Sequence, residues 1–439
     1  MGALRLSVKQ GLSCFLSDFS HLKKELKEEV ISLGMDFEED GHTIDKLKEF
    51  GTVVKSPGIP ETAPIISQLR AEGISVISEI EFASRYTNAN IIGITGSNGK
   101  TTTTLLTTHL LKQSGINVVS AGNVGNSLSN LLMEEAPEVI VLELSSFQLD
   151  DIAGFRPNIG IILNITADHL DRYEYDMSKY ADAKFNLAKY MTFDHLLILN
   201  ADDELSHERV GQVNPQVQEI SILRKVNEGA YLDGEYLVFD NEKSLQVIDV
   251  HNLPLLGKHN YYNQMAAILV AIELGVSLEQ ILTGLKTFKN VEHRLEIVTE
   301  VEGVLFINDS KATNVDAVYY ALEAMDRSIV WIAGGINKGN DYTQIKQLVK
   351  EKVKNLVCLG KDNRHLINEF SQDVNKYNEV SSADEAVDIA FELANPGDVV
   401  LLSPACASFD LFKNYEERGD LFKKAVLRLK KKESNQVEA

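Results

Sequence analysis

Short apolar runs rich in β-branched residues alternate with stretches of helical pattern along almost the whole chain. This alternation is typical of parallel sheets covered by helices, so the sequence predicts an α/β protein. Most of the runs end in Gly, Ser, Asn or a charged residue, and open α/β sheets carry their ligand-binding loops at such ends. The predicted strands cover residues 52–55, 74–78, 91–95, 118–120, 139–142, 160–163, 196–199, 304–307, 329–333, 356–359 and 399–402.

Polar breaks divide this pattern into three parts. Polar residues at 87–90 precede a new apolar strand, and at 288–293 a helical region gives way to a fresh series of strand–helix units. The sequence therefore predicts three domains. Residues 214–254 have shorter alternating runs and turn pairs, which predicts an antiparallel segment inside the central domain. The predicted domains are residues 1–88, 89–290 and 291–439.

The first residues have the pattern of a β-α-β unit without its first strand. Residues 3–9 predict a helix, Gly11 ends it, and residues 12–16 predict a strand. In a doubly wound sheet the missing strand is central, so its loss would expose the edges of both neighbours. Either the natural start lies upstream or this domain is impaired, and we favour the first explanation.

The charge balance narrows the classes of partner. The chain has 43 Lys and Arg against 64 Asp and Glu, a net charge of −21. This excess of acid disfavours a nucleic-acid-binding protein or a basic membrane-surface protein, although local sites can still bind phosphate. No apolar run approaches the roughly 20 residues of a spanning helix, and no basic-then-apolar leader is visible. Three widely spaced cysteines fit a reducing compartment, so we predict a cytoplasmic protein.

The strongest chemical signal is the loop at residues 93–102, which follows an apolar strand and opens a helix. Consecutive backbone N–H groups and a helix N-terminus form an anion cradle, Lys100 can reach terminal phosphates, and Thr101 can hold Mg²⁺. The loop is not a strict P-loop, because Ile94 stands where that motif has glycine. A simple glycine-rich turn that contains a lysine is the alternative.

Three further residues stand near predicted strand ends or helices. Glu143 ends an apolar strand, where a carboxylate beside a phosphate loop suits Mg²⁺. His169, next to Asp168, follows the strand at 160–163; such a histidine is often only a surface residue, but its position favours the site. By composition alone, Lys184 is a solvated helix lysine.

The residues at 95–102, 143–148 and 168–171 resemble the central domain of the Mur ligases, the ATP-dependent amide-forming enzymes of bacterial cell-wall precursor synthesis. Residues 307–314, 402–410 and 412–419 resemble the member that adds D-glutamate. The resemblance covers essentially the whole chain. It implies a Rossmann-like N-terminal domain, a P-loop-type central ATPase domain with a parallel sheet, and a Rossmann-like C-terminal domain.

The resemblance also implies the reaction. ATP phosphorylates the alanyl carboxylate of UDP-N-acetylmuramoyl-L-alanine to an acyl phosphate, and the amine of D-glutamate attacks it. ATP and Mg²⁺ are the expected cofactors, and a monomer is expected. Lys100, Glu143, His169 and Lys184 are the implied catalytic residues, with Lys184 typically carbamylated in this family.

The remaining roles are carried over residue by residue. Thr101 and Glu143 would hold a first Mg²⁺, and His169 and Lys184 a second. ATP would be bound by Gly96, Ser97, Asn98, Gly99, Lys100, Thr101, Thr102, Asn260, Asn263, Arg294, Asp309 and Lys311. The other substrates would be bound by Ser56, Asn123, Ser145 and Gln148 on the nucleotide-sugar side and by Thr313, Lys338, Ser408 and Phe409 on the D-glutamate side.

Two alternatives remain open. One is another amino-acid ligase, either a sibling Mur enzyme or a folylpolyglutamate-type enzyme. The other is a nucleotide-binding scaffold that makes no amide. A panel of amino acids tests the first alternative, and D-glutamate-dependent release of phosphate tests the second.

Overall fold

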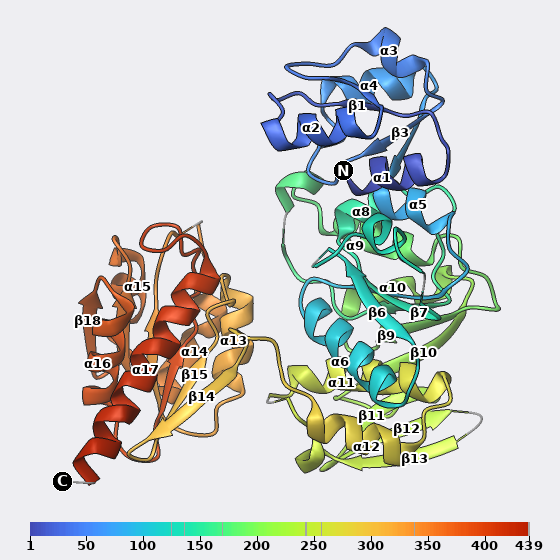
Figure 1. Cartoon of the computed structure of the whole chain (residues 1–439). Coiled ribbons are helices and arrows are strands. Elements are labelled where there is room, and N and C mark those ends of the chain that lie inside the picture. The colour runs from blue at the N-terminus through green and yellow to red at the C-terminus, as the bar shows by residue number, and fades with distance from the viewer. Residues whose placement is uncertain are drawn as a thin grey trace. The chain divides into compact units, whose positions relative to one another are not determined.

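The computed structural model describes residues 1–123, 125–135, 137–168, 170–241, 244–255, 257–337 and 339–437 (Figure 1). The chain separates into two compact units. The first unit contains Met1–Leu253 and Tyr262–Phe288, and the second contains Pro254–Tyr261 and Lys289–Ala439. The division into domains at 1–88, 89–290 and 291–439 stays a prediction.

The N-terminal part of the first unit contains two separate parallel strand pairs, β1–β2 and β3–β4. Leu69 of α4 and Val76 of β4 belong to its small apolar core. The two pairs are not joined into one sheet. The elements here are α1 (Gly2–Lys9), β1 (Phe15–Ser17), α2 (Lys24–Ser32), β2 (Asp36–Glu38), α3 (Ile44–Lys48), β3 (Thr52–Lys55), α4 (Pro64–Ala71), β4 (Ser75–Ser78) and α5 (Glu79–Ser84).

The rest of the first unit is built on a nine-stranded sheet of order β13-β12-β11-β10-β9-β8-β5-β7-β6. Its central strands are apolar along their length and buried on both faces, as parallel strands covered by helices must be. The elements are β5 (Asn90–Thr95), α6 (Lys100–Gln113), β6 (Val118–Gly122), α7 (Leu128–Leu131), β7 (Val139–Glu143), α8 (Ser146–Asp150), β8 (Ile159–Ile162), η1 (Leu170–Tyr173), α9 (Met177–Phe185), η2 (Asn186–Ala188), β9 (Leu196–Asn200), α10 (Glu204–Arg209), η3 (Val210–Gln212), β10 (Gln216–Ser221), β11 (Gly229–Asp233), β12 (Tyr236–Asn241), β13 (Ser244–Asp249), η4 (Val250–Asn252), α11 (His259–Glu273) and α12 (Leu278–Thr287).

The predicted antiparallel segment at 214–254 is only partly antiparallel. β11, β12 and β13 pair antiparallel in succession, as expected. β10, however, pairs parallel with β9, and β11 pairs parallel with β10. The segment therefore extends the edge of the main sheet. The alternating pattern of β10 could not reveal this, because it reports which side chains are buried and not the direction of the neighbouring strand.

The second unit is a six-stranded sheet of order β14-β15-β19-β16-β17-β18, parallel except for β14 against β15. One apolar cluster includes residues of α13, α14 and α15, and another includes residues of α16 and α17, so helices cover both faces (Figure 1). The elements are β14 (Glu296–Val301), β15 (Val304–Asn308), α13 (Val315–Glu323), β16 (Ile329–Ala333), α14 (Thr343–Lys352), β17 (Val353–Leu359), α15 (Arg364–Phe370), β18 (Lys376–Val380), α16 (Ala383–Leu393), β19 (Val399–Leu402) and α17 (Tyr415–Val437).

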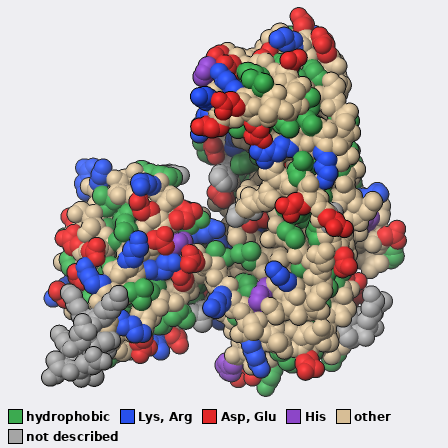
Figure 2. Space-filling model, in the orientation of Figure 1, with side chains coloured by type: hydrophobic (Ala, Val, Ile, Leu, Met, Phe, Trp, Pro, Cys, Tyr) green, Lys and Arg blue, Asp and Glu red, His purple; other side chains and the backbone are tan. Residues whose placement is uncertain are grey.

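Acidic and basic side chains are interspersed over the face drawn in Figure 2. Although the net charge is −21, this face also carries many Lys and Arg side chains. Within the described ranges, no helix has both the length and the apolar character needed to cross a membrane.

Candidate active site

A glycine-containing loop joins β5 to α6 in the first unit. β5 ends at Thr95 and α6 begins at Lys100. Gly99 caps the helix with a φ of 86°, a left-handed conformation that other residues adopt only at a cost. A Cβ atom at this position would also overlap the Oδ1 atom of Asn263. Two independent constraints therefore require glycine here, and the loop leads into a helix start whose N–H groups and dipole favour an anion.

A second loop, after β8, fixes the conformation of the first. The backbone N–H of Asn98 donates to Oδ1 of Asn164 at 2.8 Å, and the Asn164 amide donates back to the Asn98 carbonyl at 3.0 Å. The Ser97 hydroxyl donates to the Thr166 carbonyl at 2.8 Å and accepts from the Thr166 N–H at 2.9 Å. These reciprocal bonds bring two of the predicted loops together.

Two lysines converge on one carbonyl oxygen of the glycine loop. Nζ of Lys100 lies 2.6 Å from the Gly96 oxygen, and Nζ of Lys184, from α9, lies 2.8 Å from it. Lys184 is 1% exposed, and its Nζ lies 4.5 Å from the ring centroid of Tyr180. Burial, and then the charge of Lys100, hold the pKa of Lys184 well below its ordinary value. Lys184 is therefore not the solvated helix lysine that composition indicates.

The third predicted loop follows β7. Glu143, the last residue of β7, is buried, and its Oε1 accepts a hydrogen bond of 3.0 Å from the side chain of Asn123. Ser145 and Gln148 form a capping box at the start of α8. The Ser145 hydroxyl accepts from the Gln148 N–H at 3.3 Å, and Oε1 of Gln148 accepts from the Ser145 N–H at 3.0 Å. Both side chains thus stabilise the helix start that follows Glu143.

The donor atoms of these loops suit a phosphate and Mg²⁺. Thr101 and Glu143 offer oxygen atoms, which this hard cation prefers. The hydroxyl of Thr102, in the first turn of α6, is buried and has no hydrogen-bond partner among the described residues. Lys184 has no lone pair for a metal while it is protonated, and as a carbamate it would be an oxygen ligand. His169 lies outside the described residues, so its geometry is not part of this site.

In the second unit, loops that follow β15, β16 and β19 lie against one another. The N–H of Ala405 donates to the Ala312 carbonyl at 3.0 Å, and the N–H of Gly334 donates to the Pro404 carbonyl at 2.9 Å. Their position at the carboxyl ends of parallel strands is where α/β sheets bind ligands. The described parts of these loops are residues 309–314, 334–337, 339–340 and 403–410.

A buried arginine of α17 holds all three loops. Arg418 donates to the carbonyls of Ser310, Gly334 and Cys406 at 2.9, 3.3 and 3.2 Å, and its Nε donates to the Ser310 hydroxyl at 3.0 Å. Its side chain is 1% exposed, and burial lowers its pKa to about 10. No role was predicted for Arg418 from the sequence. Its partners lie as far as 108 residues away in the chain, so only the tertiary structure reveals them.

Asp309 is buried beside these loops. Its carboxylate accepts from the Ser403 hydroxyl at 2.8 Å and from the Leu295 N–H at 3.1 Å. Burial raises its pKa to about 7, and the positive charge of Arg294 opposes that shift. Asp309 is therefore held in a fixed orientation, and its burial distinguishes it from an ordinary surface carboxylate.

The predicted D-glutamate residues have different environments. Ser408 is buried, whereas Phe409, the next residue, is 66% exposed. Thr313 lies in the loop after β15 and is half-buried. Lys338 lies outside the described residues.

The chain matches two family models. Residues 94–271 match the Mur ligase middle domain, and residues 293–406 match the Mur ligase, glutamate ligase domain. A protein of Christiangramia forsetii named UDP-N-acetylmuramoylalanine--D-glutamate ligase is 46% identical over 431 residues, which are 98% of this chain and 97% of that protein. The same name is given to a Porphyromonas gingivalis protein that is 45% identical, with 98% of this chain and 96% of that protein covered. The chain belongs to the Mur ligase family.

Solved structures support the fold of this Mur ligase. MurF ligase from Thermotoga maritima in complex with ADP has a TM-score of 0.65 and 16% identity, with 94% of this chain and 95% of that chain covered. A pseudomurein peptide ligase type C from Methanothermus fervidus has a TM-score of 0.60 and 19% identity, with 98% and 96% covered. The predicted multi-domain α/β fold is thus confirmed, and the similar relatives confirm the predicted family.

Within this Mur ligase, the geometry brings several of the predicted residues of the first unit together. The glycine loop, Lys100, Lys184 and Asn263 lie side by side in the first unit, and Glu143 lies next to Asn123. Ser56 is exposed in the turn after β3, in the N-terminal part of that unit. The ATP residues Asn260, Arg294, Asp309 and Lys311 belong to the second unit.

Proposed function

We propose that this chain is an ATP-dependent ligase that joins D-glutamate to UDP-N-acetylmuramoyl-L-alanine during the synthesis of peptidoglycan precursors. The similarity to relatives of that name along nearly the full chain supports the assignment. The observation that carries the chemistry is the convergence of Lys100 and Lys184 on the Gly96 carbonyl, at the start of a helix that follows a parallel strand. Lys100 adds positive charge to the helix N-terminus, where a triphosphate needs it, and Lys184 lies beside the same carbonyl.

The reaction has two steps. A carboxylate oxygen of the alanyl group attacks the γ-phosphorus of ATP, and the bond to the β-phosphate oxygen breaks to give an acyl phosphate and ADP. The amine of D-glutamate then attacks the acyl carbon, loses a proton, and expels inorganic phosphate as the amide forms. Both substrates of the first step are anions, so cations must offset their repulsion. Lys100 is the described side chain best placed to do so.

Thr101, Glu143, His169 and Lys184 are the residues that we propose as holders of Mg²⁺. Bound Mg²⁺ neutralises the phosphate oxygens and polarises the phosphorus. The buried carboxylate of Glu143 is held by Asn123 at 3.0 Å, which orients it as a ligand. An orienting partner of this kind is typical of metal-binding carboxylates.

The low pKa of Lys184 supports its carbamylation. Only the neutral amine can attack carbon dioxide; the new C–N bond forms, a proton leaves, and a carbamate results. Burial at 1% exposure favours the neutral amine. The product carries the oxygen ligand that a lysine cannot provide.

For the remaining substrates, we retain the assignments of the sequence analysis. Ser56, Asn123, Ser145 and Gln148 are proposed on the nucleotide-sugar side. Thr313, Lys338, Ser408 and Phe409 are proposed for D-glutamate, together with the ATP residues of both units. A monomer in the cytoplasm without a nucleic-acid or membrane partner also remains our prediction.

The test is release of ADP by the purified chain with Mg²⁺. We expect ADP only when ATP, UDP-N-acetylmuramoyl-L-alanine and D-glutamate are all present. Activity with a different amino acid from a panel would assign the chain to a sibling enzyme. Binding of ATP without any amino-acid-dependent release of phosphate would instead indicate the nucleotide-binding scaffold.

A further inference from the structure

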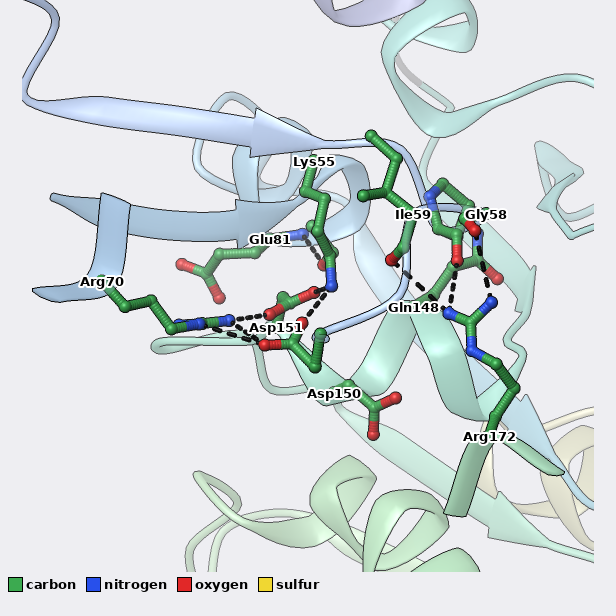
Figure 3. A network of polar contacts seen from close by, with 12 residues as sticks. Lys55, Gly58, Ile59, Arg70, Glu81, Gln148, Asp150, Asp151 and Arg172 are labelled. Atoms are coloured by element: carbon green, nitrogen blue, oxygen red, sulfur yellow. Dashed lines mark hydrogen bonds and ion pairs between the residues drawn. The ribbon is translucent and has the colours of Figure 1, made fainter. Parts of the chain in front are cut away.

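An arginine with no predicted role contacts the turn that follows β3. Arg172 lies in η1, shortly after the loop that fixes Ser97 and Asn98. Its Nη1 donates to the Gly58 carbonyl at 3.2 Å, and its Nη2 donates to the carbonyls of Pro57 and Ile59 at 3.4 Å each. Figure 3 shows the guanidinium of Arg172 directed at this turn. One side chain thus contacts three consecutive carbonyl oxygens that lie about 115 residues away in the chain.

The turn itself is well defined. The Ile59 N–H donates to the Ser56 carbonyl at 3.0 Å, which closes a four-residue turn. A peptide unit is planar and its N–H points opposite to its carbonyl. Because Arg172 holds the Pro57 carbonyl, it also sets the direction of the Gly58 N–H, which therefore points away from the guanidinium. Gly58 is exposed, so this N–H direction matters for any ligand that approaches the turn.

The guanidinium is itself held in place. Its central carbon lies 4.5 Å from the ring centroid of Phe147, a residue of α8. A planar guanidinium can stack on a ring and still use its N–H groups, which an ammonium cannot do in the same way. Arg172 is therefore fixed between α8, which follows Glu143 in the chain, and the turn after β3.

A second set of contacts anchors the start of the same turn. Lys55, the last residue of β3, is 5% exposed, and its Nζ lies 2.6 Å from a carboxylate oxygen of Asp151 at the end of α8. Arg70 of α4 binds the other oxygen of Asp151 (Figure 3). Glu61 also forms an ion pair with Lys55. The residue before the turn is thus fixed to α8 through ion pairs, so Arg172 has only the turn itself left to position.

We propose that Arg172 is a positioning residue for the nucleotide-sugar substrate. Arg172 holds the turn at residues 56–59 in one conformation relative to the loop that joins β5 to α6. This inference rests on the proposed function, because it requires Ser56 and its neighbours to contact that substrate. Arg172 does not take part in the chemistry, so its loss should weaken binding of one substrate and leave the chemical step intact.

The test is steady-state kinetics of Arg172→Gln with all three substrates. We expect KM for UDP-N-acetylmuramoyl-L-alanine to rise about tenfold, since the turn would sample other conformations. KM for ATP, KM for D-glutamate and kcat should stay within about twofold. Arg172→Lys keeps the positive charge but not the forked N–H groups of the guanidinium. Its KM for UDP-N-acetylmuramoyl-L-alanine should therefore lie between that of the unchanged protein and that of Arg172→Gln. Arg156→Gln removes the same charge from an exposed position and should match the unchanged protein.

An unchanged KM for the nucleotide-sugar substrate in Arg172→Gln would overturn the proposal, as would an equal rise of all three KM values. If Arg172→Gln does not fold, the intermediate KM expected for Arg172→Lys decides instead. The proposed function fails separately, because in that case the unchanged chain itself would release no ADP with the three substrates.

Discussion

Arg418 is the residue on which the loops of the second unit most depend. Replacement by methionine keeps much of the apolar stem of the side chain. It removes the N–H groups that Arg418 donates to the oxygens of Ser310, Gly334 and Cys406. A buried acceptor left without a donor costs about 1–3 kcal/mol. We expect Arg418→Met to lower the free energy of unfolding of the second unit by about 3 kcal/mol.

The same helix provides the control for Arg418. Arg428 pairs with Asp384 and Asp388, but its side chain is 38% exposed. Exposed ion pairs contribute about 0–1 kcal/mol to stability. Arg428→Met should therefore lower the free energy of unfolding by less than Arg418→Met does. The readout is urea unfolding followed by the fluorescence of Trp331, the single tryptophan of the chain, which is buried in β16. Equal losses in the two variants would contradict the role given to Arg418.

The buried carboxyl of Asp309 predicts a pH dependence of stability. Its pKa is raised to about 7 in the folded protein, above the ordinary value of 3.8. Between these values the folded protein keeps the proton and the unfolded chain has lost it, so this group's contribution to stability falls as pH rises from about 4 to about 7. Asp309→Asn lacks this titration.

Urea unfolding of both proteins at a series of pH values measures the effect of Asp309. The difference in unfolding free energy, unchanged protein minus Asp309→Asn, should decrease with pH across that window and level off above it. All other titrating groups are shared and cancel in the difference. A difference that stays constant or increases with pH would show that Asp309 is not buried as described. Since the Trp331 indole donates to the Ser403 carbonyl at 2.7 Å, and the Ser403 hydroxyl contacts Asp309, the fluorescence reports on the right region.

At the scale of elements, the sequence was most informative where chemistry and structure are both local. The strand, loop and helix of β5 and α6 could be predicted because the glycines, the lysine and the apolar run are consecutive. β14 and β18 were not predicted. Both are edge strands with partly exposed faces, so their apolar pattern is weak. The roles of Arg172 and Arg418 also escaped prediction, because their partners come from distant segments.

Two glycines at the ends of α6 separate the effects of backbone conformation and of space. Gly99 and Gly115 both have positive φ, 86° and 92°. A Cβ at Gly99 would overlap Asn263, whereas at Gly115 nothing lies within 4 Å. The left-handed conformation costs each alanine about 1 kcal/mol, but only Gly99→Ala must also displace either the Asn263 side chain or the loop that joins β5 to α6.

We expect Gly99→Ala to weaken the binding of Mg²⁺–ADP at least tenfold, and Gly115→Ala to leave it within about twofold. Isothermal titration calorimetry of both variants measures this directly. Similar affinities in the two variants would mean that the glycine loop does not bind the nucleotide.

At the scale of the whole molecule, the proposed ATP residues belong to both compact units. A ligand that binds only the folded state stabilises whichever unit supplies its contacts, by about 2.7 kcal/mol at a concentration of 100 times its Kd. For units of this size, that corresponds to roughly 5–10 °C in the unfolding temperature. Trp331 reports on the second unit alone, whereas far-UV circular dichroism reports on both.

Heating the chain with and without Mg²⁺–ADP therefore tests the two halves of the nucleotide assignment separately. If Asn260, Arg294, Asp309 and Lys311 contribute to binding, the unfolding temperature reported by Trp331 fluorescence should increase together with that of the first unit. If the unfolding temperature rises when followed by circular dichroism but not when followed by fluorescence, the glycine loop stays in the proposed site and those four residues do not. If neither transition moved at a saturating concentration, the proposed nucleotide site would be wrong as a whole, since no contact made only in the folded state can leave its stability unchanged.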